Sequence, residues 1–445
     1  MLQALIHAIT RRMPASWHAK LSAWYARHGV PILMHTCGLN NALAEVLFGK
    51  YTGRRAHARR MARLRKIRQK PTITVAFQVW NLGMWKSDSL YRLMAQHPRF
   101  SPIMWVPGVP GLDAEQTAAM RETVLTFCRQ QGYTYTTSPS WEELDAQIAP
   151  DLVFIADPYP HYINMQPAAI QHLVCYIRYC FPNTCTASET DLFWHNNALF
   201  YFQENSLIEQ EHRQKMRNRG VNSRVTGHPI VDYLTGEDAS PRPAWKNPHL
   251  KKVIYAPHWA IGTSPSFFTV GTFLQTGEFM LQLAKKYAQH VQFAFKPHPW
   301  LYRELCQTPG WGKEKADAYY AAWQELPNTQ LELGQYKELF RQSDAMIHDS
   351  GSFIIEYLLM NKPCMFLQQG SDFRAFNSCT HQALQCYTLA RSTADIEQFL
   401  NEQVLAGSDT LKQKRSDFVR AHLLPPHGQS AAQNIISCIL ESSNK

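Results

Sequence analysis

The chain has 445 residues and a formal net charge of +10, and 45% of its residues are hydrophobic and 12% aromatic. This composition excludes a disordered chain, a collagen and a small disulfide scaffold, because none of these has so large a share of core-forming residues. The length predicts two domains, each with its own core.

The positive charge lies at one end of the sequence. Residues 1–70 hold ten arginines and four lysines against one acid, Glu45, which leaves 31 basic and 34 acidic residues for the rest of the chain. A segment of charge +13 is therefore followed by a nearly neutral remainder of charge −3. A basic segment on a neutral body favours an anionic surface as partner, either membrane lipid or nucleic acid.

The segment 53–70, GRRAHARRMARLRKIRQK, predicts a helix that is basic over most of its circumference. The stretch before it is amphipathic, with Leu2 and Leu5 at helical spacing and Trp17 and Trp24 further on. Aromatic rings beside arginines suit the headgroup region of a membrane. We favour docking on an anionic membrane surface over a solvated helical face or nucleic-acid binding, because no known nucleic-acid signature accompanies the charge.

The sequence gives no sign of membrane crossing or export. No run approaches the roughly 18 to 20 apolar residues that a spanning helix needs. Arg11, Arg12 and Lys20 interrupt any secretion signal, and the ten cysteines include no C-x-x-C pair, so we expect reduced thiols. The expected location is the cytoplasm, peripherally on the inner face of the plasma membrane.

Apolar runs typical of buried strands alternate with helical patterns along the rest of the chain, which predicts an α/β protein with parallel sheets covered on both faces. The first strands are expected at 72–79, 102–106, 152–156, 173–177 and 199–202, with a helix at 88–96. A proline-rich polar segment, 238–249, predicts the interdomain linker. After it, strands are expected at 253–257, 291–296, 345–347 and 363–367, and helices at 277–290 and 353–360.

Two motifs at strand ends carry the candidate chemistry. In FKPHP, at 295–299, His298 can donate to a phosphate or move a proton, and Lys296 can neutralise phosphate charge. The alternative is a buried turn histidine beside a solvated lysine.

The second motif is HDSGSFIIEYL, at 348–358, in which a tight loop precedes a helix. The first N–H groups of such a helix form an anion site, to which serine hydroxyls add donors. Ordinary N-capping by the acid or a serine explains the same residues. The candidates for donor binding are Asp349, Ser350, Gly351, Ser352 and Glu356, the last of which could accept from ribose hydroxyls.

Two further motifs end in histidines. YAPHW, at 255–259, places His258 at a strand end of the second domain, and VTGHPIVDYL, at 225–234, places Gly227 and His228 at the end of the first. A plain strand-to-loop turn also explains the latter motif. The sequence contains no G-x-G-x-x-G, Walker loop, H-E-x-x-H, G-x-S-x-G or Asp-x-Asp pattern, so we expect neither a cofactor nor a metal.

The ordered motifs YAPHW, FKPHP, DAMIHDSGSFIIEYL and KPCMF resemble the second domain of the CDP-glycerol glycerophosphotransferase family, the teichoic-acid primases, polymerases and relatives of surface-polysaccharide clusters. The resemblance implies a GT-B-like fold of two facing Rossmann-like domains preceded by the basic helical segment. Together with the charge distribution and the proline-rich linker, it suggests a basic segment at 1–70, an acceptor-side domain at 71–237, the linker at 238–249, and a donor-binding domain at 250–445 that ends in a closing helix. Residues 1–70 have no counterpart among the family's motifs.

The resemblance also implies roles. His298 would lie at the transferred phosphate, Ser350 and Ser352 would hold the diphosphate, and Glu356 the ribose. His258, which its strand-end position presents to the same side of the second sheet, is the other catalytic candidate. The first-domain histidine of the family has no clear equivalent, and His161 and His195 are the candidates.

The expected function is transfer of glycerol phosphate, or a related phospho-polyol, from a CDP-activated donor to a hydroxyl of a lipid-linked or surface glycan. The alternatives are a GT-B glycosyltransferase that uses a nucleotide sugar, and a non-catalytic protein that binds an anionic surface. Nucleic acid is not an expected partner.

Overall fold

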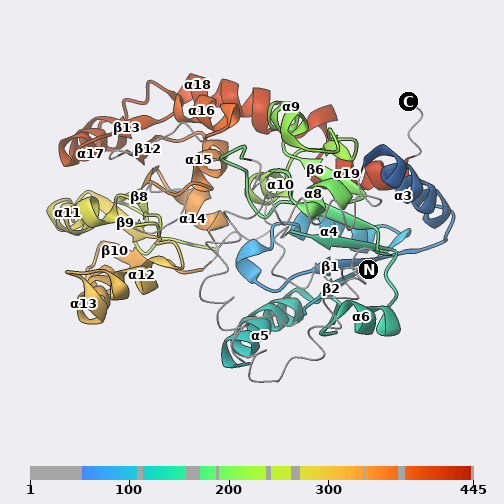
Figure 1. Ribbon diagram of the computed structural model, residues 1–445. Coiled ribbons are helices and arrows are strands. Elements are labelled where there is room, and N and C mark those ends of the chain that lie inside the picture. The colour runs from blue at the N-terminus through green and yellow to red at the C-terminus, as the bar shows by residue number, and fades with distance from the viewer. Residues whose placement is uncertain are drawn as a thin grey trace.

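The computed structural model describes residues 53–107, 114–156, 171–186, 190–236, 242–261, 271–334, 336–368 and 376–441. The amphipathic stretch at the start of the chain and His161 lie outside these residues. The described part forms two α/β domains, each built on one parallel sheet, which confirms the predicted fold class (Figure 1).

The first sheet has seven parallel strands in the order β3-β2-β1-β4-β5-β6-β7. Side chains of β1 alternate between two cores: Val75 and Phe77 pack with α4 on one face, and Ala76 packs with α6 and α8 on the other. Burial on both faces explains why these strands read as nearly continuous apolar runs. The strands are β1 (Ile73–Gln78), β2 (Phe100–Trp105), β3 (Tyr135–Thr136), β4 (Leu152–Ile155), β5 (Val174–Ile177), β6 (Phe200–Gln203) and β7 (Ser223–Val225).

Helices of the first half connect these strands and cover the sheet. They are α3 (Gly53–Ile67), α4 (Asp88–Gln96), α5 (Ala114–Gln131), α6 (Trp141–Gln147), α8 (Phe193–Asn197), α9 (Ser206–Lys215) and α10 (Pro229–Thr235), with a short 3-10 turn at Leu82–Met84.

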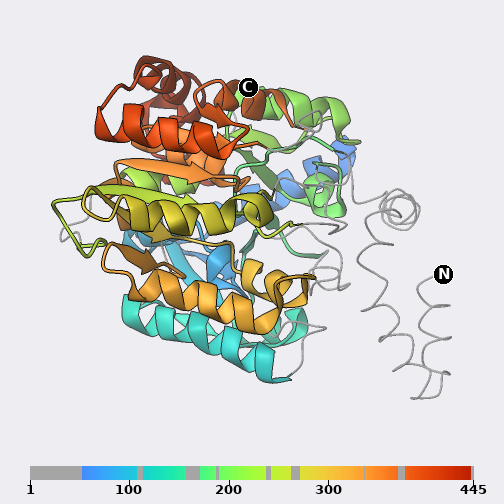
Figure 2. The same cartoon turned by 90° about the vertical axis from the view of Figure 1, so that its left-hand side faces the viewer.

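The second sheet has six parallel strands in the order β10-β9-β8-β11-β12-β13. Along β8, Val253 and Tyr255 pack under α11 and α13, whereas Ile254 and Ala256 pack under α14, α15 and α16. Figure 2 shows α11 and α13 lying across one face. The strands are β8 (Lys251–Ala256), β9 (Val291–Phe295), β10 (Thr329–Leu331), β11 (Ala345–His348), β12 (Cys364–Leu367) and β13 (Thr388–Ala390).

The helices of the second half alternate with these strands, as the sequence predicts. They are α11 (Phe273–Lys286), α12 (Leu301–Gln307), α13 (Gly312–Glu325), α14 (Lys337–Gln342), α15 (Phe353–Glu356) with its 3-10 continuation Tyr357–Met360, α16 (Ser378–Leu384), α17 (Thr393–Phe399), α18 (Lys412–Phe418) and α19 (Ala431–Leu440).

The last helix, α19, returns to the first domain, although its sequence position suggests the second. Its buried face, with Ile435 and Ile439, belongs to the core of the first sheet and packs on α4. Asp232 accepts from the backbone N–H groups at the start of α19, and Arg68 donates to the carbonyl oxygens of Cys438 and Ile439 at its end. In Figure 1, α19 accordingly lies beside α3. An apolar stripe and two oppositely charged caps thus fix the helix to the first half.

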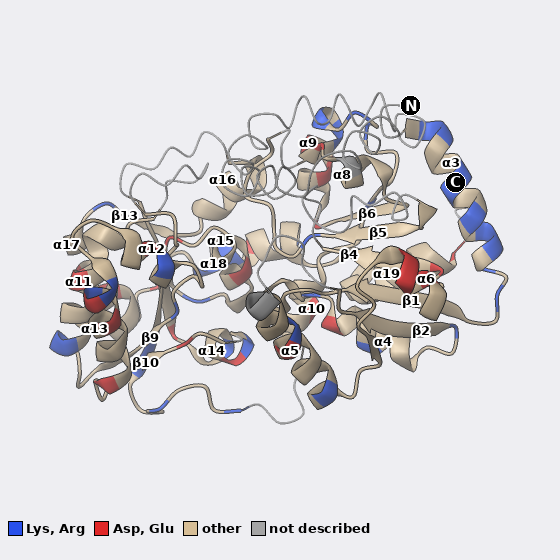
Figure 3. Cartoon of the chain, turned by 60° about the horizontal axis from the view of Figure 1, so that its bottom comes forward, with Lys and Arg blue, Asp and Glu red and all other residues tan. Residues whose placement is uncertain are grey.

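The basic helix predicted after residue 53 is present as α3. Ala56, His57, Arg60 and Leu64 form its buried stripe. Figure 3 shows the basic residues running along the helix at the edge of the molecule. The exposed cations of α3 are Arg54, Arg55, Arg59, Arg63, Arg65 and Lys66. None of the helices in the described ranges is long and apolar enough to cross a bilayer.

Candidate functional site

Three of the predicted motifs follow neighbouring strands of the second sheet. β8 lies between β9 and β11, and the three strands are parallel. The segments 257–260, 296–300 and 349–352 therefore leave the sheet at one edge. Ligands of open α/β sheets bind at this carboxyl edge.

His258 and His298 come together at this edge, with 5.4 Å between their ring centroids and 60° between their planes. The backbone N–H of His298 donates to the carbonyl oxygen of Pro257 at 3.0 Å, which holds the two loops side by side. The sequence predicted both histidines at strand ends, and the structure makes them a pair.

Local backbone contacts settle which ring nitrogen of each histidine is available. Nδ1 of His258 accepts from the N–H of Ala260 at 3.1 Å, and Nδ1 of His298 accepts from the N–H of Trp300 at 3.2 Å. In the neutral ring the proton therefore lies on Nε2. Burial lowers the pKa of His258 to about 4, and burial together with His258 lowers the pKa of His298 to about 3. At neutral pH the pair offers two N–H donors and no positive charge.

Two tryptophans flank the histidine pair. Trp259 and Trp300 meet edge to face with 5.1 Å between centroids, and each ring centroid lies 6.0 Å from that of His298. The Trp300 side chain is 57% exposed, which is unusual for so large an apolar group. The exposed ring gives a bound molecule an aromatic surface beside the histidines.

Asp349 ties the loops of the site together. One carboxylate oxygen accepts from the backbone N–H of His258, and the other accepts from the N–H and the hydroxyl of Thr272, at 2.6 and 2.9 Å. The side chain is fully buried, and burial raises its pKa to about 6. Since both oxygens are occupied, Asp349 serves as an anchor of the His258 loop in this structure.

The serine loop lies where the two domains meet. Ser350 is buried, and Ser352 holds the N-cap position of α15 without a side-chain capping bond. A Cβ atom at Gly351 would come within 2.7 Å of Nδ2 of Asn183, a first-domain residue. The first domain therefore covers this loop closely, and a larger residue at 351 would displace the Asn183 side chain. The predicted role of the serines in holding a diphosphate stays a prediction.

Lys296 and Glu356 converge on one tyrosine that the sequence did not single out. The Lys296 ammonium lies 5.5 Å from the ring centroid of Tyr336 and donates to the carbonyl oxygen of Gly334 at 2.7 Å. Burial lowers the pKa of Lys296 to about 8. Glu356 is buried and accepts from the Tyr336 hydroxyl at 2.6 Å, while Lys86 of the first domain donates to the same hydroxyl at 3.2 Å.

Gly227 and His228 have structural roles. Nδ1 of His228 accepts from the N–H of Ile230, and Nε2 donates to the carbonyl oxygen of Arg178 at 2.8 Å, so both ring nitrogens are occupied. Gly227 has φ +80°, and a Cβ there would lie 2.7 Å from Pro425. The strand-to-loop turn that the sequence allowed as an alternative accounts for both residues.

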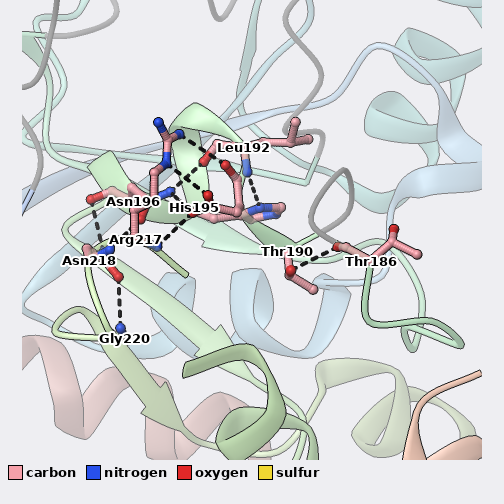
Figure 4. A network of polar contacts seen from close by, with 9 residues as sticks. Thr186, Thr190, Leu192, His195, Asn196, Arg217, Asn218 and Gly220 are labelled. Carbon is pink, nitrogen blue, oxygen red and sulfur yellow. Dashed lines mark hydrogen bonds and ion pairs between the residues drawn. The ribbon is translucent and has the colours of Figure 1, made fainter. Parts of the chain in front are cut away.

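His195 belongs to a buried polar network of the first domain (Figure 4). Its Nδ1 accepts from the N–H of Leu192 at 3.1 Å, and its neighbour Asn196 donates to Asp191 at 2.8 Å. Arg217 pairs with the same aspartate. Burial holds the pKa of His195 well below its usual value, so the ring is a neutral part of the core.

A small hollow of about 20 Å³, open to solvent, lies in the first domain at the carboxyl ends of β1, β4 and β5. Its lining includes Gln78, Trp80, Trp85 and Arg178. The side-chain nitrogen of Gln78 is buried without a hydrogen-bond partner among the described residues. The loops that follow strands β1, β4 and β5 are the feature of the sequence from which this hollow could have been predicted.

Comparison with solved structures shows that the chain shares a GT-B-like fold with several enzymes. A structure of the wall teichoic acid polymerase TagF superposes with a TM-score of 0.55 at 15% identity, covering 90% of this chain and 95% of that one. An S. aureus MnaA–UDP structure gives 0.51 at 14% identity, covering 83% and 96%. The UDP-GlcNAc 2-epimerase from Neisseria meningitidis bound to UDP-GlcNAc gives 0.50 at 15% identity, covering 83% and 99%. No family model and no curated protein matches the sequence.

At these identities the similarity establishes the shared fold of two Rossmann-like domains. The neighbours are enzymes, and their titles name UDP, UDP-GlcNAc and, for another TagF crystal, a soak with CDPG.

Proposed function

We propose that this protein transfers glycerol phosphate, or a related phospho-polyol, from a CDP-activated donor to a hydroxyl group of a lipid-linked or surface glycan. The observation that carries the proposal is the pair His258 and His298, whose neutral rings each leave an Nε2–H to donate at the ligand-binding edge of the second sheet. The four ordered motifs around this pair and the fold shared with TagF support the same chemistry.

Phosphoryl transfer needs charge stabilisation more than covalent help from the protein. The oxygen of the acceptor hydroxyl attacks the distal phosphorus of the donor and releases its proton to water. The bond from that phosphorus to the bridging oxygen breaks, and CMP leaves with the bridging oxygen. Donors fixed before the reaction stabilise the charge that develops on the phosphoryl oxygens. The Nε2–H groups of His258 and His298 supply such donors, and Lys296 supplies positive charge.

The geometry favours one of the two roles open to His298. To accept a proton at Nε2, the neutral ring would have to carry its proton on Nδ1, which already accepts from the N–H of Trp300. A ring whose pKa is about 3 is also a weak base. We therefore assign His298 as a hydrogen-bond donor to the transferred phosphate.

The test measures the released nucleotide. Purified protein is supplied with CDP-glycerol, CDP-ribitol or UDP-sugars and a glycan acceptor, and CMP and UDP are quantified. CMP release that depends on acceptor and is lost in His298→Ala supports the proposal. The exposed His290 provides a matched control, since His290→Ala keeps the site intact.

The second candidate is a UDP-sugar enzyme, which the fold shared with the UDP-bound and UDP-GlcNAc-bound structures favours. Release of UDP, or epimerisation of UDP-GlcNAc without release, would replace the phosphotransferase assignment. If no nucleotide binds at all, the remaining hypothesis is that the protein is not an enzyme and binds anionic surfaces through α3.

A further inference from the structure

One contact in the candidate site crosses between the domains. Lys86 follows β1 in the first domain, and Tyr336 precedes α14 in the second. The Lys86 ammonium lies 3.2 Å from the Tyr336 hydroxyl and 4.9 Å from the centroid of its ring. A cation over an aromatic face and a hydrogen bond to its hydroxyl act together here.

Tyr336 also contacts Glu356, the acid that is predicted to bind the ribose of the donor. The Tyr336 hydroxyl has a single proton, which it donates to Oε2 of Glu356 at 2.6 Å. Its oxygen can therefore accept from the Lys86 ammonium. The result is a chain from a first-domain ammonium through a phenol to a second-domain carboxylate that is only 1% exposed.

The charged and titratable groups around Glu356 come from four segments of the chain. Burial raises the pKa of Glu356, and Lys86 opposes that rise most strongly, followed by Tyr336. The Cys180 thiol, from the loop after β5, faces both Glu356 and Lys86, but burial raises its pKa to about 12 and leaves it neutral. Lys296 lies near the same tyrosine ring and is held by a backbone carbonyl. Lys86 is therefore the cation that acts on Glu356.

We propose that Lys86 is a positioning residue of the donor site, which holds the Glu356 carboxylate ionised and oriented through the Tyr336 hydroxyl so that it can accept from the hydroxyl groups of the donor's ribose. This inference rests on the proposed function and adds a first-domain residue to it. A buried carboxylate without this cation takes up a proton more readily and then presents a hydroxyl where an acceptor is needed. The donor site is therefore complete only when the two domains are in contact.

The experiment measures donor affinity against pH for the full-length protein. Lys86→Met removes the charge at nearly equal length, Lys86→Arg keeps it, and Tyr336→Phe removes only the hydroxyl. Lys285→Met, on the exposed surface of α11, is the matched control. The dissociation constant of CDP-glycerol is determined by calorimetry between about pH 5 and about pH 8.

In wild type we expect binding to weaken as the pH falls through the pKa of Glu356. In Lys86→Met that midpoint moves to higher pH by about one unit, so that at pH values below both midpoints the variant binds about tenfold more weakly than wild type. Tyr336→Phe shows the same direction, Lys86→Arg restores the wild-type midpoint, and Lys285→Met leaves it unchanged. A purely structural bridge would lower thermal stability without moving the midpoint, and that result overturns the inference.

The two proposals fail in different ways. If wild type binds CDP-glycerol and Lys86→Met binds it with the same affinity and pH profile, the role of Lys86 is wrong and the phosphotransferase proposal stands. If wild type binds only a UDP-sugar, the phosphotransferase proposal fails, and the same variants are compared with that ligand. If no nucleotide binds wild type, both proposals fail.

Discussion

His258 and His298 lie with ring centroids 5.4 Å apart, and Nδ1 of each ring accepts a hydrogen bond from the backbone N–H two residues later in its own loop. The same local turn thus occurs twice, at the ends of two adjacent strands. Because each turn fixes the tautomer of its ring, the pair presents two donors rather than a donor and an acceptor.

Glutamine replacement distinguishes a donor from a base. A glutamine amide can still donate a hydrogen bond but cannot take up a proton. If His298 acts as a donor, His298→Gln retains more of the CMP-releasing activity than His298→Ala, which we expect to lose about a hundredfold to a thousandfold. Steady-state kinetics of both variants provide the measurement, and equal loss in both would contradict the donor role.

The lowered pKa of His298 makes stability depend on pH. The folded value is about 3, against 6.5 for the free side chain, so the unfolded state binds the extra proton between these values. Stability from this residue is present above 6.5 and is lost as the pH falls toward 3. In denaturant unfolding, His298→Gln should therefore lose less stability than wild type on acidification. If the free energy of unfolding falls equally with pH in the two proteins, burial does not lower the pKa of His298.

Gly227→Ala should destabilise the first domain. The residue has φ +80°, and a methyl group there would lie 2.7 Å from Pro425. Backbone strain and overpacking together predict a loss of about 2 to 4 kcal/mol. Gly132 has φ +68° with open space around it, so Gly132→Ala should cost only about 1 to 2 kcal/mol. Denaturant unfolding of both variants tests whether the crowding by Pro425 is real.

The exposed cations of α3 predict binding to anionic vesicles. Arg55, Arg59 and Arg63 lie one turn apart on the exposed side of the helix. Each basic residue near an anionic surface contributes about 1 kcal/mol, so replacing all three by glutamine should weaken binding about a hundredfold. Co-sedimentation with phosphatidylglycerol vesicles measures the effect, which should decrease with added salt.

The control for this experiment replaces three exposed lysines of the second domain, Lys251, Lys285 and Lys414, by glutamine. This variant has the same net charge as the α3 variant. Equal losses in the two variants would show that overall charge, and not α3, drives the binding. Tighter binding of wild type to RNA than to vesicles would favour a nucleic-acid partner instead.

Most strands and helices could be predicted from the sequence, and so could the edge of the second sheet at which His258 and His298 lie. Apolar runs gave β1, β8 and β11 within two residues of their observed bounds, because parallel strands are buried on both faces. His258, Lys296 and His298 could be named because chemistry at the carboxyl edge follows from strand order alone. The four short edge strands β3, β7, β10 and β13 were not predicted, since strands of two or three residues leave no clear pattern.

Contacts between the domains could not be predicted from the sequence. Lys86 and Tyr336 are far apart in the chain, and neither lies in a motif, so only the packing of the two domains reveals their hydrogen bond. Asp349 shows that a local motif also leaves out contacts with distant residues. It lies in the motif that favoured an anion site, yet its oxygens accept from His258 and Thr272, which no local pattern indicates.

The return of α19 to the first sheet has a consequence for how the protein is made. A growing chain leaves the ribosome from its N-terminus, and early domains usually fold before later ones are synthesised. Here the first core includes Ile435 and Ile439, so it stays incomplete until nearly the whole second domain has emerged. Part of the apolar surface of the first domain therefore stays exposed to solvent until α19, which is synthesised last, has packed against it.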